Sequence, residues 1–471
     1  MIDRRAQQAF AWAVAIGLWL VLALHVFGDP RPPSGMWGVV GILALAPPTR
    51  FALIAIAAVL VLPPVGRRCA AAWLPPLRRA VSRLTVVPPW IWIGLLVGIA
   101  WTLRSRTLYG DAEIIIHELN RGQLIYYKEP LDRLIVALVF RGLHALFGVD
   151  ARFAIALVNT SAGALFWGAM VRLARLRPLG PGAGWAVWLL VGTTGTIETF
   201  FGNIEKRALL AAGAAWVLVL AIETVLDRRR SMAPAAGALG LTFAVHLSAV
   251  WVVPSLVCAW YARHRHVLRR PRPPGALKAA VREAARGLEL SLLPFTLVAF
   301  GMVLAGMSLA GFSPETFGGA DGKMFVPMFT ITTAYERFTM FSGAHLAAFA
   351  NEMLLLAPVG LVLIIAATAA CVWRRRYMDN AGRVVLAASI ATVIYAFTFN
   401  PDMMVANPMF GTLNEWDLFS LAGVPLSLTG LWSLRMATDP GPTRDGALLS
   451  ASVVSLVHVV PWILLNAGVR L

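Results

Sequence analysis

Apolar runs of about 20 residues, the length that a helix needs to cross a bilayer, recur along the whole chain. Hydrophobic residues occupy 58% of the 471 positions and charged residues only 14%, whereas soluble proteins carry about a quarter. The sequence therefore predicts an all-α, polytopic membrane helical bundle that forms a single transmembrane domain over residues 1–471. The first run is expected to be a retained helix, because no convincing small-residue cleavage site follows it.

About thirteen transmembrane helices are expected, with the N-terminus inside and the C-terminus outside. They cover residues 10–27, 37–62, 88–103, 152–171, 184–201, 208–225, 233–245, 247–260, 288–310, 345–372, 383–397, 417–434 and 447–465. Segment 37–62 is interrupted by Pro47-Pro48, so it is either one kinked helix or a helical hairpin. Arg50 in that segment is awkward, because an arginine at mid-membrane is costly.

The net charge of +17 is compatible with a nucleic-acid partner, but the positions of the basic residues argue against one. Most lie in short loops between apolar runs, as the positive-inside rule requires of a membrane protein. The largest such loop, residues 263–286, is predicted to be a cytoplasmic anchor attracted to anionic lipid. The three cysteines are scattered and give neither a metal spacing nor a disulfide framework. We expect a bacterial inner (cytoplasmic) membrane protein.

Residues 104–148 interrupt the apolar pattern with a polar, charged stretch, which we predict to be the first large extracytoplasmic loop. Seven Lys and Arg residues lie between 104 and 152, on the side where the positive-inside rule disfavours them. Binding an anion would explain that breach. Residues 111–125 and 131–147 are expected to be helical. The second segment has one polar face and is predicted to lie flat at the interface as a juxtamembrane helix.

Polar residues at the ends of other predicted spans fall on the same side as Asp111. They are Glu205 and Lys206 before one span, His246 at a tight turn between two short apolar segments, and Asp417 at the start of another. Residues 311–344 form a second extracytoplasmic loop, interpreted either as a lid over the site or as an ordinary flexible loop. Charged groups gathered at one membrane face suit a reaction of a charged lipid headgroup.

The segment Lys128-Glu129-Pro130-Leu131, followed by an amphipathic helix, Phe147-Gly148 and Arg152, resembles the Lys-Pro-Pro-Leu segment of GT-C glycosyltransferases. The nearest families in pattern are the protein O-mannosyltransferases and the lipid A aminoarabinose transferases. The resemblance covers residues 103–176 and implies a GT-C bundle with juxtamembrane helices in the first outer loop. It also implies that Asp111 is the catalytic carboxylate and Lys128 a phosphate-binding cation. The chain departs from the pattern at Gly110, where a second acid is usual, and at Glu129, which replaces a proline.

The same residues suggest a chemistry: sugar transfer from a polyprenyl-phosphate donor to an acceptor on the periplasmic face, with inversion. Asp111 would act as general base on the acceptor hydroxyl. Three cations, Lys128, Arg133 and Lys206, would neutralise the donor phosphate. The acceptor, or a divalent cation such as Mg²⁺, Mn²⁺ or Ca²⁺, would be held by Glu113, Glu205, His246 and Asp417.

Structural roles and other functions remain open alternatives at this point. The structural roles are a helix cap for Asp111 or Asp417, an interfacial charge for Lys128, Arg133 or Lys206, and a packed histidine for His246. A transporter or flippase of a lipid-linked or anionic solute would use similar cations and broken helices. A third possibility is a non-catalytic scaffold in the cell envelope.

Overall fold

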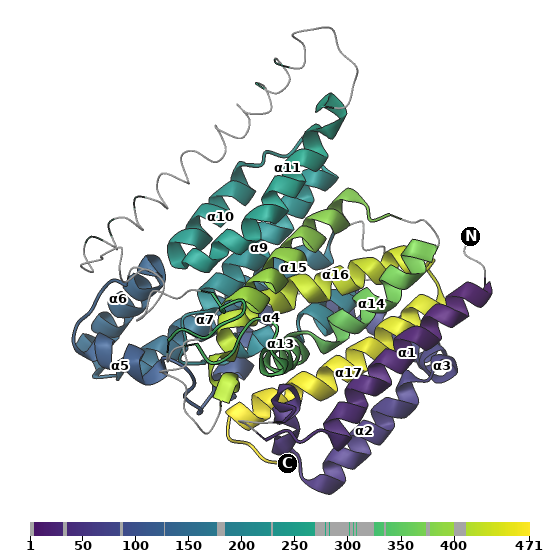
Figure 1. Ribbon diagram of the computed structural model, residues 1–471, viewed down its shortest axis with the longest axis horizontal. Coiled ribbons are helices and arrows are strands. Elements are labelled where there is room, and N and C mark those ends of the chain that lie inside the picture. Colours follow the sequence, from purple (N-terminus) through teal and green to yellow (C-terminus); the bar gives the residue numbers. More distant parts are fainter. Residues whose placement is uncertain are drawn as a thin grey trace.

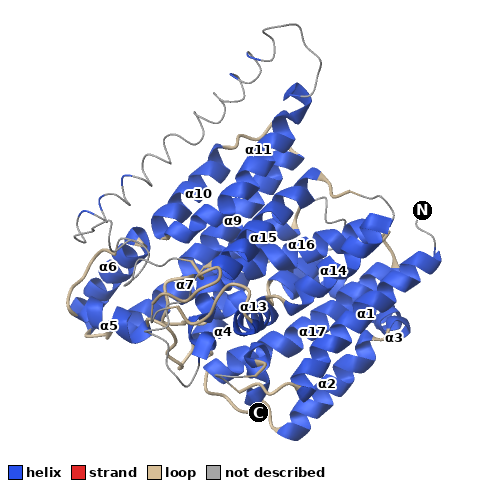
Figure 2. Cartoon of the chain, viewed as in Figure 1, coloured by secondary structure: helices blue, strands red, loops and turns tan. Residues whose placement is uncertain are grey.

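The computed structural model describes residues 4–31, 35–84, 88–126, 128–176, 184–227, 229–268, 325–333, 336–373, 377–399 and 411–471, and the single residues 278, 282, 301, 305 and 308 (Figure 1). The described regular structure is helical, with one isolated β-bridge between Phe325 and Phe399 (Figure 2). The predicted all-α architecture is therefore confirmed.

The helices follow one another through the bundle in chain order. They are α1 Arg4–Phe27, η1 Trp37–Ala44, α2 Pro47–Val61, α3 Pro63–Leu84, α4 Pro89–Thr102, α5 Ala112–Asn120, α6 Pro130–Phe147, α7 Ala151–Ala174, α8 Gly184–Ala186, η3 Val187–Val191, η4 Gly195–Phe200, α9 Ala208–Leu226, α10 Ala233–Val245, η5 Leu247–Val252, α11 Val253–Leu268, α13 Gly343–Leu356, α14 Pro358–Trp373, α15 Asn380–Thr398, η7 Gly411–Ala422, α16 Gly423–Ala437 and α17 Pro442–Asn466.

Six helices in the described residues are long and apolar enough to cross a membrane, and the number rises to eight if each of two bent pairs counts as one span. The chain is thus an integral multi-pass membrane protein. The expected count of about thirteen is not reached by the described residues, and it stays a prediction. The expected span 288–310 lies almost wholly outside them.

Two expected spans are broken by proline. Trp37–Ala44 and Pro47–Val61 meet at 115°, so segment 37–62 is sharply bent rather than one gently kinked helix. The predicted continuous helix 345–372 is wrong: Gly343–Leu356 and Pro358–Val372 meet at 99°. Proline has no N–H to donate and its ring clashes with the preceding turn, which explains both breaks. Arg50 lies in the first turn of α2, next to the first break.

The loops that carry the candidate site meet at one end of the bundle, called here the α6 end. Backbone N–H groups of Ser105 and Arg106 donate to the carbonyls of Phe201 and Asn466, at 2.6 and 2.7 Å. The N–H of Leu247 donates to the Lys128 carbonyl at 3.0 Å. Helices α5 and α6 lie beside each other at the edge of this end (Figure 1). Segments that are far apart in the sequence are therefore held together by main-chain hydrogen bonds.

Arginine ion pairs gather at the opposite end. Glu223 at the end of α9 pairs with Arg172 of α7 and with Arg230, both at 2.6 Å. Asp379, the N-cap of α15, pairs with Arg435 at the end of α16 at 2.9 Å. The two ends of the bundle therefore differ in chemistry: this one is tied by arginine–carboxylate pairs, whereas the α6 end combines lysine, histidine and carboxylates.

Helices α14 and α16 cross closely at two glycines, which generates a stability prediction. A Cβ on Gly430 would lie 2.8 Å from the Gly360 carbonyl oxygen, and backbone of this kind cannot easily give way. We expect Gly430→Ala to cost about 1–3 kcal/mol, as overpacking typically does. Thermal unfolding in detergent would measure it. Gly94→Ala in α4 is the matched control, because that Cβ meets nothing within 4 Å. Equal losses in both variants would contradict this account of the crossing.

Candidate active site

The centre of the site is the buried carboxylate of Glu129, just before α6. Its Oε1 lies 2.7 Å from Lys206 Nζ, and its Oε2 lies 3.4 Å from His246 Nε2. Burial alone would raise the pKa of this carboxyl, but the charge of Lys206 and the hydrogen bond with His246 outweigh it and hold the pKa well below its usual range. Glu129 is therefore an anion that its neighbours compensate, as a buried charge requires.

Lys206 is positioned by the turn between η4 and α9. Gly202 has φ +66°, a left-handed conformation that favours glycine, and it starts the turn. The Asn159 amide of α7 then donates to the carbonyls of Asn203 and Glu205, at 2.5 and 2.7 Å. These bonds fix the backbone that presents Lys206, whose ammonium also lies 4.6 Å from the centre of the Tyr126 ring. The cation is therefore held in place from three directions.

His246 separates α10 from η5, and both of its ring nitrogens are engaged. Nδ1 accepts the backbone N–H of Ser248 at 2.9 Å, while Nε2 faces Glu129 and the Arg207 guanidinium. Burial, and then the positive charge of Arg207, lower the pKa of His246 to about 4. The ring is therefore neutral at pH 7 and contributes hydrogen bonds rather than charge.

Arg207 links the centre of the site to η7. Its Nε lies 3.5 Å from Asp417 Oδ2, and both side chains are largely buried. Asp417 thus reaches the site from a segment more than 200 residues further along the chain. Lys128 lies close enough to Glu129, Lys206 and Arg207 to interact electrostatically with each. Burial, assisted by the two other cations, lowers the pKa of Lys128.

Asp111 stands at the open side of this cluster. It occupies the N-cap position of α5, but its side chain makes no capping hydrogen bond. Its Oδ2 lies 3.9 Å from Lys206 Nζ, and the side chain is 43% exposed. The purely structural alternative, a side-chain cap, is therefore not realised, and the carboxylate is accessible beside a cation.

Two further buried carboxyls border a small cavity of about 10 Å³, close to the smallest space that holds one water. Burial and then the charge of Glu129 raise the pKa of Asp132 to about 8. Burial, followed by the negative charges of Asp417 and Asp111, raises the pKa of Glu205 well above its usual range. Both are therefore protonated near neutral pH, which limits the negative charge in the cluster.

Arg133 and Glu113 lie apart from this cluster. Arg133 is buried between α5 and α6, where it pairs with Glu118 and donates to the Ile115 carbonyl at 3.3 Å. Glu113 is exposed on α5. The structure brings the other predicted residues together at one end, namely Asp111, Lys128, Glu205, Lys206, His246 and Asp417. Their roles are not tested by this proximity.

Sequence reasoning alone misses three members of the cluster, Glu129, Asp132 and Arg207. In the sequence Glu129 stands out only as a departure from a motif, although an acid between Lys128 and a helix-starting proline is a signal for an ion pair. Arg207 has no signal of its own beside Lys206. The expected polar segment 400–402 lies outside the described residues, as does most of 311–324 and Tyr335.

The residues expected to hold a divalent cation do not converge. Within the described residues, no group of three or more His, Cys, Asp or Glu side chains is placed to hold a metal ion. His246 has both nitrogens engaged, and Glu113 is exposed on α5, apart from the cluster. The residues present therefore do not fit the expected metal site.

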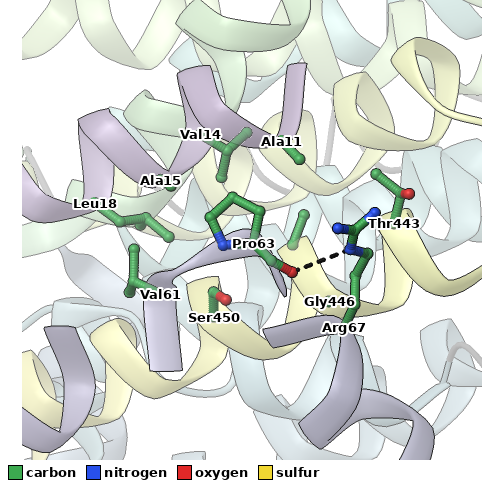
Figure 3. Close-up of a pocket in the computed structure, with 11 residues that line it drawn as sticks. Ala11, Val14, Ala15, Leu18, Val61, Pro63, Arg67, Thr443, Gly446 and Ser450 are labelled. Atoms are coloured by element: carbon green, nitrogen blue, oxygen red, sulfur yellow. Dashed lines mark hydrogen bonds between the residues drawn. The ribbon is translucent and has the colours of Figure 1, made fainter. Parts of the chain in front are cut away.

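A second small cavity lies away from these charges, between α1, the α2–α3 junction and α17 (Figure 3). It has about 10 Å³ and is lined mainly by apolar side chains such as Val14, Leu18 and Val61. Arg67 closes one side and donates to the Pro63 carbonyl at 3.2 Å. The cavity offers no cluster of reactive groups and is a packing gap.

No protein-family model matches the chain, and no curated protein matches it either. Two solved structures are similar to it. ArnT from Cupriavidus metallidurans in the apo state is 17% identical, with a TM-score of 0.45 over 80% of this chain and 76% of ArnT. ArnT bound to undecaprenyl phosphate is 12% identical, with a TM-score of 0.42 over 81% and 76%. These values describe a distant likeness in the path of the chain.

The raised pKa of Asp132 predicts a pH-dependent stability. An unfolded aspartate titrates near pH 4, about four units below the folded value of about 8. Between these values the unfolded state binds fewer protons, so stability falls as pH rises. Asp132→Asn should remove that fall, and its advantage over wild type should grow from pH 4 to 8 in thermal unfolding. Asp150→Asn, at an exposed N-cap, is the control. Parallel curves for wild type and Asp132→Asn would refute the prediction.

Proposed function

We propose that the chain is a membrane glycosyltransferase of the GT-C type, which transfers a sugar from a polyprenyl-phosphate donor to an acceptor at the periplasmic face of a bacterial inner membrane. One observation carries the proposal: three cations, Lys128, Lys206 and Arg207, surround a site at one end of a membrane bundle, beside the accessible carboxylate of Asp111. The cations suit an anionic headgroup, and the carboxylate suits a proton acceptor.

The donor phosphate would lie against Lys128 and Lys206, the two primary amines of the cluster. Their charge stabilises the phosphate as the bond from the anomeric carbon to the phosphate oxygen breaks. Arg207 is tied to Asp417, and Glu129 is tied to Lys206, so these pairs orient the cations before substrate binds. Arg133, which is buried against Glu118, would act as a positioning residue for α5.

Asp111 would accept the proton of the acceptor hydroxyl while that oxygen attacks the anomeric carbon. The new glycosidic bond forms as the phosphate leaves with the electron pair of the broken bond, and the released polyprenyl phosphate remains in the membrane. Asp111 is suited to this role because it is exposed, does not cap α5 and lies next to a phosphate-binding cation. A single displacement gives inversion at the anomeric carbon.

The alternative function is a transporter or flippase of a lipid-linked or anionic solute. The bends of 115° and 99° favour it, because broken helices are common at transporter binding sites. The concentration of charged groups at the α6 end favours the enzyme. A transferase changes covalent bonds, whereas a transporter leaves them intact, so product analysis separates the two functions.

The test of the proposed base is Asp111→Asn. We expect transfer of label from polyprenyl-phosphate sugars to membrane acceptors to fall about 10²- to 10⁴-fold, the usual contribution of a general base. Removing the carboxylate leaves no proton acceptor but preserves the side-chain shape. The assay would use a panel of radiolabelled donors with wild-type and variant membranes of equal protein content.

Glu113→Gln is the matched control, since it neutralises an exposed carboxylate two residues away on the same helix. It should retain wild-type transfer. Unchanged transfer in Asp111→Asn would refute the assignment of the base while leaving the enzyme class intact. Movement of an unaltered lipid-linked solute, with no transfer from any donor, would instead support the transporter.

A further inference from the structure

A second polar cluster lies behind the charged one and plays no part in the reaction steps above. We call it the inner polar layer, formed by Tyr109, Glu198, Glu352, Trp416, Trp462 and Asn466. These residues come from the loop before α5 and from η4, α13, η7 and α17. All six side chains are at most 5% exposed. A buried group of carboxyl, amide, phenol and indole functions is unusual in a helical membrane bundle.

Several contacts hold the inner polar layer together. The Tyr109 hydroxyl donates to Asn466 Oδ1 at 2.8 Å, and the Tyr109 and Trp462 rings lie 6.0 Å apart. Trp416 meets Trp462 edge to face, with their centroids 5.7 Å apart. Glu198 lies beside both Tyr109 and Asn466 and interacts electrostatically with the phenol. The layer is therefore one connected site and not a set of scattered residues.

Many polar atoms in this layer are buried without a hydrogen-bond partner. They are both carboxyl oxygens of Glu198, Oε1 of Glu352, Nδ2 of Asn466 and the Nε1 atoms of Trp416 and Trp462. Asn466 lies next to Glu198, but the two do not reach hydrogen-bond geometry. Each buried unsatisfied group costs about 1–3 kcal/mol. Donors and acceptors left open together in one place are what a polar ligand would satisfy.

The inner polar layer adjoins the proposed reaction site. Trp416 and Asp417 are consecutive residues of η7, and Asp417 pairs with Arg207. Glu352 interacts electrostatically with Asp417. Tyr109 is two residues from Asp111 in the chain. A group attached to a phosphate at Lys128 and Lys206 is therefore within reach of the layer.

We propose that the inner polar layer binds the sugar of the donor, and that it selects an uncharged or amino sugar over a uronic acid. Carboxyl oxygens accept from sugar hydroxyls, while the amide and indole N–H groups donate to them. The indole rings add apolar surface that suits a sugar ring. In the described residues, no Lys or Arg pairs with Glu198 or Glu352 through an ion pair, so a carboxylate on the sugar meets only acids. This inference rests on the proposed transferase function and names its substrate class.

The experiment compares binding of one polyprenyl phosphate without sugar and the same phosphate carrying glucose, glucosamine or glucuronic acid. In wild type, at least one of the neutral and amino sugars should tighten binding about tenfold, or about 1.4 kcal/mol, and glucuronic acid should add nothing. Glu198→Gln and Trp462→Phe should remove that gain and leave the binding of the bare phosphate unchanged. Calorimetry on the full chain in detergent would measure the four affinities.

Two matched variants at the opposite end serve as controls. Trp432→Phe removes an indole N–H that donates to Asp379, and Glu223→Gln alters a buried carboxylate paired with arginines. Both should keep the gain from the sugar. The two site variants test the layer independently, so one that fails to fold leaves the other as the test.

The outcomes separate this inference from the proposed function. A wild type that binds the bare phosphate but gains nothing from any sugar overturns the inner polar layer as a sugar site and leaves the phosphate site standing. The layer is equally overturned if Glu198→Gln and Trp462→Phe keep the full gain, because ordered water would then account for the open polar atoms. A gain greatest for glucuronic acid overturns the selectivity. A wild type that does not bind the bare phosphate defeats the proposed function and this inference with it.

Discussion

The α6 end of the bundle depends on the compensation of one buried charge. An isolated carboxylate at the Glu129 position would be too costly to keep ionised, and its pKa would rise. Instead Lys206 lies 2.7 Å away and His246 3.4 Å away, and the pKa falls. Removing one partner of such a pair typically costs about 3–5 kcal/mol, because the other charge is left buried alone. The segments that carry these side chains are therefore bound to one another.

That compensation also sets the state of the surrounding acids. Because Glu129 keeps its negative charge, Asp132 retains its proton up to a pKa of about 8. Glu205, near Asp417 and Asp111, is likewise driven toward the protonated form. The cluster keeps its cations charged while two of its acids are neutral. An anionic ligand then meets less repulsion than the number of carboxyl groups suggests.

Breaks in the helices place polar groups where continuous helices would not. A lipid-exposed backbone must satisfy its hydrogen bonds internally, so irregular segments are found where protein surrounds them. Segments η4, η5 and η7 interrupt the helical bundle and bring Glu198, Ser248 and Asp417 to the α6 end. The main-chain bonds from Leu247 to Lys128 and from Ser105 to Phe201 close these breaks. The site is built from interrupted helices, packed on the regular ones.

The sequence by itself determined the class of the fold and the location of its unusual charges. Apolar runs in a chain with 14% charged residues predict membrane helices, because burying that surface in lipid needs no tertiary information. Asp111 and Lys128 could be singled out because they interrupt such runs. Only the tertiary structure decided that Glu129 joins Lys206 and His246, and that Arg133 turns to Glu118 instead. Those choices depend on contacts between residues up to more than a hundred positions apart, and local patterning carries no information about which charges will meet.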